Sequence, residues 1–434
     1  MHLRSGGPRF AAESVPWQTD FPATEFRQRH ERIFDHIGNR AVALVAGAAA
    51  ADGFQIFRPS NEFYYLCGIE TPQSYLLLDG RTRTVSLYLP HRDTDREKNA
   101  GKLLSAEDPD LVRTLTGVDA VYGVEVLSRH LAGLGLRPPA PAVFVPHSPA
   151  EGVASSRDEL LYQRALIAAD PWDGQSPREA WFLDLLRRRL PALEIRNLTP
   201  VMDELRAIKS EREISLIRRA SQIAARGILE AMRSTRFGLA EYQLDATARY
   251  IFLLNGARYE GYPSITAGGT NAFFGHYFRK DSILADGDLV LMDFAPDYRY
   301  YTSDVTRIWP VNGKFSDDQR KLWEFIGAHR EALIRRIRPG ATADGILDGA
   351  RDEMKKFVSK LVFTVFNQSN IPDQAWTQHR FTFVAAEANS DIRFGFQNPI
   401  DDNGRPRQMG HPDTGRTPSM EMRLLRFLLF RATR

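Results

Sequence analysis

Two aspartates, Asp293 and Asp304, lie in neighbouring β-rich runs of the sequence and are the first candidates for chemistry. If the turn is centred between Tyr298 and Arg299, Asp293 stands directly opposite Asp304. Directly opposed side chains of an antiparallel pair have Cβ atoms about 4.5–5.5 Å apart on one face of the sheet. The two runs span residues 288–294 and 300–308, and a short polar link, residues 296–299, lies between them. This arrangement suits a β-hairpin.

Two carboxylates placed in this way repel each other, so that one of them takes up a proton or a cation binds between them. Hard divalent metals such as Mn²⁺ prefer oxygen ligands of this kind. Two other interpretations stay open at this stage. The pair is also compatible with a solvated acidic edge hairpin, because the link lacks the Asn-Gly that would fix the register. A slip of one residue would put the two carboxylates on opposite faces.

The elements that must position these aspartates can be predicted from periodicity. Residues 211–232 place apolar side chains at helical spacing, and a second helix is predicted over 241–255. Further upstream, short apolar runs alternate with polar turns and helical segments, which is typical of an α/β domain. The runs are 41–46, 75–78, 85–89 and 142–145, with helices predicted at 26–38 and 179–190.

These patterns divide the chain, because 434 residues exceed what one ordinary core holds. We expect a loose N-terminus rich in Gly, Pro and small polar residues, two folded domains with a linker between them, and an atypical tail. The predicted parts are residues 1–24, an N-terminal domain (25–150), a linker and connecting helix (151–200), a second domain (201–358) and the tail (359–434).

Composition narrows the class of protein. Apolar residues make up 43% of the chain and charged residues 26%, as in a soluble globular protein. No run is long and apolar enough to span a bilayer, the N-terminus lacks the apolar core of a secretory signal, and the single cysteine, Cys67, excludes an internal disulfide. We therefore expect a cytoplasmic protein without a membrane partner. The net charge of +3 is dispersed, which gives no support to nucleic-acid binding.

Several ordered segments resemble the pita-bread (creatinase/aminopeptidase P-like) metallopeptidases, and most of all the Xaa-Pro aminopeptidases. Residues 57–68, Phe-Arg-Pro-Ser-Asn-Glu-Phe-Tyr-Tyr-Leu-Cys-Gly, are similar to the N-terminal domain signature of aminopeptidase P. Residues 256–277, which end in Gly-His-Tyr, resemble the family's substrate-side segment. Residues 287–293 and 301–307 resemble its metal hairpin, and further matches are 206–214, 313–320 and 339–340.

This resemblance implies an α/β N-terminal creatinase-like domain followed by an α+β pita-bread domain. In such a site Asp293 would bind one metal with both oxygens, and Asp304 would bridge two metals, usually Mn²⁺. A hydroxide held between the ions would attack the scissile carbonyl. His276 would contact the substrate and stabilise the tetrahedral intermediate by hydrogen bonding. Arg58 and Tyr65 of the N-terminal signature are expected to pack that domain rather than to do chemistry.

The implied activity is release of an N-terminal residue that precedes proline, from proline-containing peptides. The family often forms homodimers through the N-terminal domain, so a homodimer is expected. A dipeptidase or a creatine-type amidinohydrolase on the same fold is a related possibility, although the N-terminal signature favours the proline-directed peptidases.

The distal part of the family's pattern is not found in this sequence. The family completes its site with a Gly-His-Gly-type segment, a second histidine and two metal-binding glutamates on later strands. The pita-bread domain therefore looks incomplete in its C-terminal half, and we hypothesise that the tail is a foreign reading, such as a retained intron, a frameshift or an alternative transcript. The alternative function is a catalytically inactive homologue that binds peptides or proteins. The candidates that fit no ordered set are His379, Glu387, His411 and Glu421.

Overall fold

The computed structural model describes residues 17–51, 53, 55–134, 142–151, 155–358, 362–365 and 381–384. The chain divides into two compact units. The N-terminal unit contains the described residues up to Ala220, together with 257–262 and 296–302. The second unit contains 221–256, 263–295 and the described residues from Ser303 onward.

The N-terminal unit is built on a six-stranded mixed sheet in the order β4-β3-β2-β1-β5-β6. Strand β2 pairs antiparallel with β1 and β3, whereas the pairs β3–β4, β1–β5 and β5–β6 are parallel. The strand bounds are β1 (Val42–Ala46), β2 (Tyr75–Asp79), β3 (Thr84–Leu89), β4 (Ala120–Gly123), β5 (Ala142–Val145) and β6 (Glu194–Asn197).

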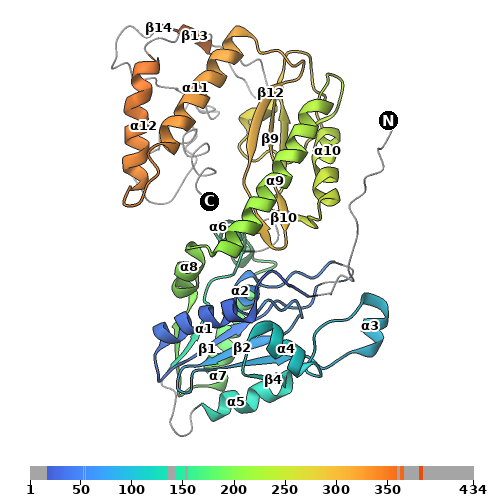
Figure 1. Cartoon of the computed structure of the whole chain (residues 1–434), viewed down its shortest axis with the longest axis vertical. Coiled ribbons are helices and arrows are strands. Elements are labelled where there is room, and N and C mark those ends of the chain that lie inside the picture. The colour runs from blue at the N-terminus through green and yellow to red at the C-terminus, as the bar shows by residue number, and fades with distance from the viewer. Residues whose placement is uncertain are drawn as a thin grey trace. The chain divides into compact units, whose positions relative to one another are not determined.

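Helices cover both faces of this sheet (Figure 1). Side chains alternate along a strand, so β1 sends Ala43 and Val45 into one core and Val42 and Leu44 into the other. This double burial explains why the strand is a continuous apolar run. The first core takes α1 (Ala23–Ile37), α2 (Asn61–Cys67), α4 (Pro109–Thr116) and α8 (Thr199–Ala207), and the second takes α5 (Leu127–Gly133) and α7 (Arg178–Arg189).

Two further helices and a 3-10 turn of this unit contribute no buried side chain: α3 (Thr94–Ala100), α6 (Arg157–Ala169) and η1 (Val124–Val126). The helices predicted at 26–38 and 179–190 and the four predicted strands are confirmed to within a few residues.

The boundaries of the N-terminal unit differ from the expected ones. Residues 151–200, expected to be a linker and connecting helix, also supply strand β6, and their helix α7 packs Leu183 and Leu186 into the second core. Before α1, Gln18 and Phe21 are buried, so the folded part begins ahead of residue 25. Residues 1–16 of the expected loose terminus lie outside the described residues.

The second unit contains a three-stranded antiparallel sheet in the order β12-β9-β8. Its strands are β8 (Ile265–Gly268), β9 (Leu289–Asp293) and β12 (Thr306–Pro310). Helix α9 (Glu211–Ser234), which starts in the N-terminal unit, and helix α10 (Glu241–Leu254) lie along the sheet (Figure 1). Both helices were predicted from their periodicity and are confirmed.

The two faces of this sheet have different neighbours. On the helix face, the hydroxyl of Thr266 donates a hydrogen bond to the carboxylate of Asp245 on α10 (3.3 Å). On the same face, the indole of Trp309 donates a hydrogen bond to Thr235, the residue that follows α9 (2.9 Å). On the other face, which we call the loop face, Tyr277 packs against a small core. That core consists of Ile265, Ala267 and Leu291, with Ile308 and Ala272 at its edge.

The remaining elements complete the two units. In the second unit, α11 (Asp317–Ile334) and α12 (Ala343–Val358) pack on each other through Ala332, Leu333 and Ala350. Strands β13 (Val362–Val365) and β14 (Phe381–Val384) form an antiparallel pair. In the N-terminal unit, a small sheet has the order β11-β10-β7, with β7 (Tyr259–Glu260), β10 (Pro296–Tyr298) and β11 (Tyr301–Thr302).

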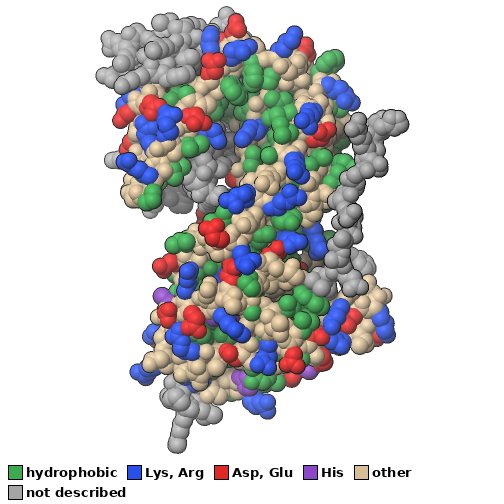
Figure 2. Space-filling model, viewed as in Figure 1, with side chains coloured by type: hydrophobic (Ala, Val, Ile, Leu, Met, Phe, Trp, Pro, Cys, Tyr) green, Lys and Arg blue, Asp and Glu red, His purple; other side chains and the backbone are tan. Residues whose placement is uncertain are grey.

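Surface charge is dispersed, as the sequence indicates. On the face shown in Figure 2, basic and acidic side chains are interspersed. Within the described ranges, the helices are either too short or too polar to cross a bilayer.

Candidate active site

Asp293 is the last residue of β9, and its side chain is fully buried. Its cross-strand neighbours are Ile265 on β8 and Thr306 on β12. Because directly paired residues share a face, Asp293 belongs to the loop face together with Ile265. Burial of a carboxylate costs free energy unless hydrogen bonds or a cation compensate it.

Asp304 does not stand directly opposite Asp293, so the predicted register is wrong. Thr306 faces Asp293, and the pairing continues one step further, where the Phe294 N–H donates to the Val305 carbonyl (3.2 Å). Asp304 lies two positions before Thr306, just ahead of β12, and alternation continued from that strand would place it on the same face as Asp293. Diagonal neighbours of this kind are roughly 7–8 Å apart rather than directly opposed. The shared face is therefore kept, although the direct pairing is not.

The register differs because the turn lies further along the chain than expected. Arg299 and Tyr300 form the two-residue turn, and both have positive φ angles, 55° and 68°. On either side of the turn, Tyr298 pairs with Tyr301. Positive φ at both central residues is the geometry of a type I′ turn, which normally selects Asn-Gly. Moving the turn centre by one residue shifts each cross-strand pairing by two residues, which preserves the side chains that share a face, whereas a register slip of one residue would have exchanged them.

His276 lies in the long connection between β8 and β9 and is exposed. Its ring stacks on Phe278, with centroids 6.1 Å apart and an interplanar angle of 19°. The neighbouring Tyr277 packs against the core of the loop face, on the same face as Asp293. The connection begins with a 3-10 turn (Gly269–Phe273). The structure thus brings the His276 loop and Asp293 to one face of the sheet.

Two buried acids of α10 hold this connection, and the sequence analysis did not identify them. Glu241 is fully buried and Asp245 is 4% exposed. Glu241 accepts hydrogen bonds from Asn271, Tyr277 and two backbone N–H groups. Burial, together with the contact to Glu241, raises the pKa of the Tyr277 phenol. The available signal was the presence of two acids four residues apart, on one face of a helix that packs against a sheet.

The N-terminal signature packs its own unit, as expected for Arg58 and Tyr65. The Tyr65 hydroxyl donates to the Leu205 carbonyl (3.1 Å), and Arg58 forms an ion pair with Asp297. Burial raises the pKa of Asp297, although Arg58 acts in the opposite direction.

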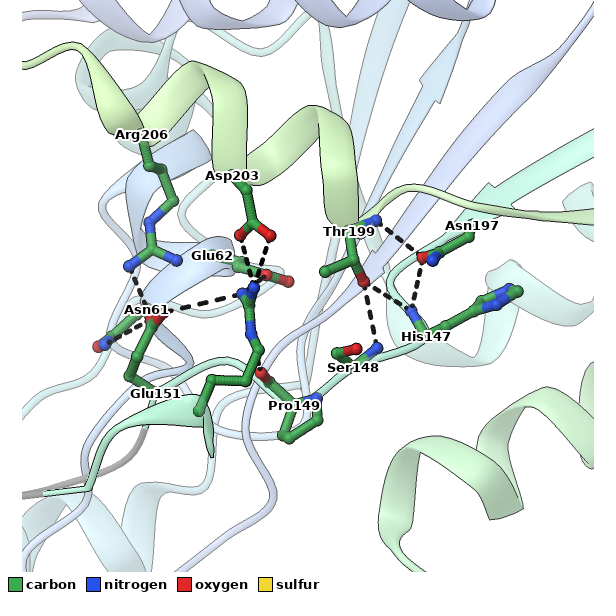
Figure 3. A network of polar contacts seen from close by, with 11 residues as sticks. Asn61, Glu62, His147, Ser148, Pro149, Glu151, Asn197, Thr199, Asp203 and Arg206 are labelled. Atoms are coloured by element: carbon green, nitrogen blue, oxygen red, sulfur yellow. Dashed lines mark hydrogen bonds and ion pairs between the residues drawn. The ribbon is translucent and has the colours of Figure 1, made fainter. Parts of the chain in front are cut away.

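A larger network joins α2, α6 and α8 in the same unit (Figure 3). Arg157 donates to both carboxylate oxygens of Asp203 at 2.6 Å and to Glu62 at 3.1 Å, while Arg206 donates to Glu151 at 2.7 Å. Burial raises the pKa of Glu62 to about 7 in spite of these arginines. The network connects three helices and has the character of a structural support.

A complete metal centre is not present among the described residues. Within the ranges that the structure describes, no group of three or more His, Cys, Asp or Glu side chains is arranged to hold an ion. Of the five protein ligands that the resemblance implies, the described residues offer two candidates, Asp293 and Asp304. The other candidates, His379, Glu387, His411 and Glu421, lie outside the described residues.

Comparison with known families identifies the class of protein. Residues 215–382 match metallopeptidase family M24, and residues 26–139 match the N-terminal domain of aminopeptidase P. The chain belongs to metallopeptidase family M24, with an α/β N-terminal domain followed by a pita-bread domain. Within that family it is aminopeptidase P-like. The M24 match reaches residue 382, beyond residue 358, where we expected the domain to end.

Individual relatives agree with this assignment. The Xaa-Pro aminopeptidase of Escherichia coli K12 is 29% identical over 354 residues, which is 78% of this chain and 73% of that protein. Intermediate cleaving peptidase 55 of Saccharomyces cerevisiae is 27% identical over 319 residues, 70% of this chain and 58% of that protein.

Solved structures show the same fold. Escherichia coli aminopeptidase P with the inhibitor Pro-Leu has a TM-score of 0.63 at 26% identity, over 79% of this chain and 75% of that chain. Proline aminopeptidase P II from Yersinia pestis has a TM-score of 0.63 at 27% identity, over 80% of this chain and 75% of that chain.

Proposed function

We propose that this protein is a metal-dependent aminopeptidase that releases an N-terminal residue preceding proline. The main support is the loop face of the second unit, where the buried Asp293, Asp304 and the loop that carries His276 belong to one side of a sheet. The aminopeptidase P-type N-terminal domain favours a proline-directed peptidase over a dipeptidase or an amidinohydrolase.

In this proposal each residue has a defined task. Asp293 and Asp304 would be metal ligands, with Mn²⁺ as the expected ion, because carboxylate oxygens suit hard divalent cations. His276 is exposed and so can reach a bound peptide, where its ring N–H would donate to the carbonyl oxygen on which negative charge develops. The described residues do not by themselves complete the metal site. The missing ligands would have to come from residues outside the described ranges or from a second chain.

The test is release of the N-terminal residue from a short Xaa-Pro peptide, with and without Mn²⁺. We expect Mn²⁺-dependent turnover that falls about a hundredfold or more in Asp304→Asn, since even changes beside metal ligands cost 10–100-fold. Asp344→Asn is the matched control, because Asp344 is an exposed acid in the first turn of α12. Turnover that is equal in Asp304→Asn and Asp344→Asn would contradict the role given to Asp304.

A catalytically inactive, peptide-binding homologue is the second candidate. It is favoured by the absence, within the described ranges, of a third metal-ligating side chain near the two aspartates. Calorimetric titration with Mn²⁺ and with a non-hydrolysed Xaa-Pro peptide separates the two candidates. Peptide binding without turnover, unchanged by Mn²⁺, would favour the inactive homologue. Measurement of mass in solution tests the expected homodimer in the same preparation.

A further inference from the structure

The connection from β8 to β9 is long and almost without secondary structure of its own. It runs from Gly269 to Asp288, and its only described helical element is the 3-10 turn Gly269–Phe273. Its aromatic side chains Phe273, Phe274 and Phe278 are half exposed, so burial of these rings does not hold it in place. A connection of this length needs specific anchors if a side chain in its middle is to keep one position.

Glu241 provides one anchor from the first turn of α10. Its Oε1 accepts from the Gly268 N–H (2.7 Å) and from the Asn271 amide (3.0 Å). Its Oε2 accepts from the Tyr277 hydroxyl (2.9 Å) and from the Ser282 N–H (3.2 Å). One carboxylate therefore contacts the strand end before the loop and three points along the loop, on both sides of His276.

Asp245 provides a second anchor one helical turn later. It accepts from the hydroxyls of Ser264, which immediately precedes β8, and of Thr266 on β8, and the Lys280 ammonium lies 3.3 Å from its Oδ1. The Lys280 ammonium also donates to Ser264 (2.5 Å), so the end of the loop is connected to the strand that begins it. Lys280 has a φ of 57°, which a lysine rarely adopts without such contacts.

The chain backbone reinforces these two anchors. The Glu241 N–H donates to the Ser282 carbonyl (3.0 Å), and the Tyr242 N–H donates to the Lys280 carbonyl (2.9 Å). The backbone at Gly268 approaches this region closely, since a Cβ there would lie 2.4 Å from a methyl group of Leu284 and would require that side chain to move. The residues around the start of α10 and those that close the loop thus form one antiparallel contact.

We propose that Glu241 and Asp245 are positioning residues, which fix the 269–282 loop and therefore His276 over the sheet face that carries Asp293. The reason is the cost of leaving a buried carboxylate without donors. The loop supplies three of the four donors of Glu241, so it cannot move away without leaving that carboxylate unsatisfied. The consequence for activity rests on the proposed function, but the positioning itself does not.

Amide hydrogen exchange of the folded full-length chain tests the positioning directly. We expect exchange in residues 269–282 to rise about tenfold or more in Glu241→Gln, because the new amide places an N–H against the Ser282 N–H. Tyr277→Phe removes only one of the four hydrogen bonds and is expected to raise exchange severalfold. Asp245→Asn is expected to loosen mainly the end of the loop near Lys280. Glu230→Gln on α9 is the control, since it removes an acid of the same unit that is not in contact with the loop.

Failure of the positioning proposal can be distinguished from failure of the proposed function. Exchange in the loop that equals the wild type in a folded Glu241→Gln protein overturns the proposal, as does a rise that is equally large in α9 and β9. If Glu241→Gln does not fold, Tyr277→Phe decides, and unchanged loop exchange there overturns it. In the Xaa-Pro assay, misplacement of His276 should lower kcat with little change in KM. A wild-type protein without turnover would contradict the proposed function while leaving the exchange result to decide the positioning.

Discussion

Glu241 of the second unit is compensated differently from Glu62 and Asp297 of the N-terminal unit, whereas Asp245, also in the second unit, is paired with Arg249 and Lys280. In the N-terminal unit, Glu62 and Asp297 are each paired with an arginine, Arg157 and Arg58. In the second unit, the four hydrogen bonds that Glu241 accepts come from uncharged groups. An arginine compensates charge strongly and joins distant parts of the chain. A set of amide and hydroxyl donors compensates it through several directional bonds.

The kind of partner that each acid has corresponds to what the partner connects, either whole helices or a single loop. The arginine pairs of the N-terminal unit connect whole elements, since Arg157 links α6 to α2 and α8. The hydrogen bonds of Glu241 instead fix the path of one exposed connection relative to one strand. A loop held by many directional bonds keeps a defined geometry, which a residue such as His276 requires for chemistry. We therefore expect variants in the first region to change stability and variants in the second to change local order.

The largest stability effect is expected for Arg58→Met. The substitution leaves Asp297 buried without its ionic partner and removes the guanidinium from its place 4.9 Å above the Tyr300 ring. Removal of one partner from a buried pair costs about 3–5 kcal/mol of unfolding free energy. Chemical denaturation measures this. Arg113→Ala is the control, because its pair with Asp110 is exposed and such pairs contribute about 0–1 kcal/mol. Equal losses in the two variants would show that the Asp297 pair is not constrained by burial.

The pH dependence of stability sharpens the comparison further. Burial raises the pKa of Glu62 from 4.5 to about 7, so the folded state binds a proton that the unfolded state releases. Stability from this group is therefore lost as the pH rises from about 4.5 to 7. Burial lowers the pKa of His30 from 6.5 to about 4. Its unfolded state binds the additional proton, so stability is lost as the pH falls from about 6.5 to 4. Each shift corresponds to about 3 kcal/mol at most.

The two groups oppose each other between about pH 4.5 and 6.5, so single variants should reveal opposite slopes. Relative to wild type, Glu62→Gln should make stability rise more steeply with pH, and His30→Gln should make it fall more steeply. Urea denaturation at several pH values between 4 and 7.5 measures both. Slopes that change in the same direction in the two variants would contradict the assignment.

Several elements followed from the sequence because burial imposed a period on them, although α4, α8, α11 and α12 were not predicted even though they bury side chains. The helices at 211–232 and 241–255 and the apolar strands of the N-terminal sheet were predicted because each has an apolar face or two buried faces. Helices α3 and α6 were missed because they bury no side chain, and so leave no such pattern. Strand β6 was missed because its residues are mostly polar at the sheet edge.

The site was predicted only in part, for a similar reason. Asp293, Asp304 and His276 could be selected because they belong to recognisable segments. Glu241 could not, because its role depends on donors up to 41 residues away that only the fold brings together. The register of the hairpin depends on tertiary contacts, which the sequence of the turn does not show.

Those contacts lie around Tyr300, and they make the turn the place for the last prediction. Its hydroxyl donates to Glu70 (2.6 Å), its ring contacts Tyr64 edge-on at 4.6 Å, and its N–H donates to the Asp297 carboxylate (2.8 Å). These interactions offset the cost of a positive φ at two residues other than glycine, which is on the order of 1 kcal/mol each. They explain why the turn lies at Arg299-Tyr300 without an Asn-Gly sequence.

Glycine substitutions at the two positions should therefore have opposite signs. Tyr300→Gly relieves the backbone and keeps the N–H bond to Asp297 but removes the hydroxyl and ring contacts, and we expect a loss of about 2 kcal/mol. Arg299→Gly relieves the same strain and removes an ion pair with Asp20 and a contact with the Tyr298 ring (5.5 Å), both made by a half-exposed guanidinium, so we expect a gain of about 0.5 kcal/mol. Denaturation of both variants in parallel is the measurement. A loss in Arg299→Gly as large as that in Tyr300→Gly would mean that the turn is held by its charge rather than by the packing of Tyr300, and that the register has another cause.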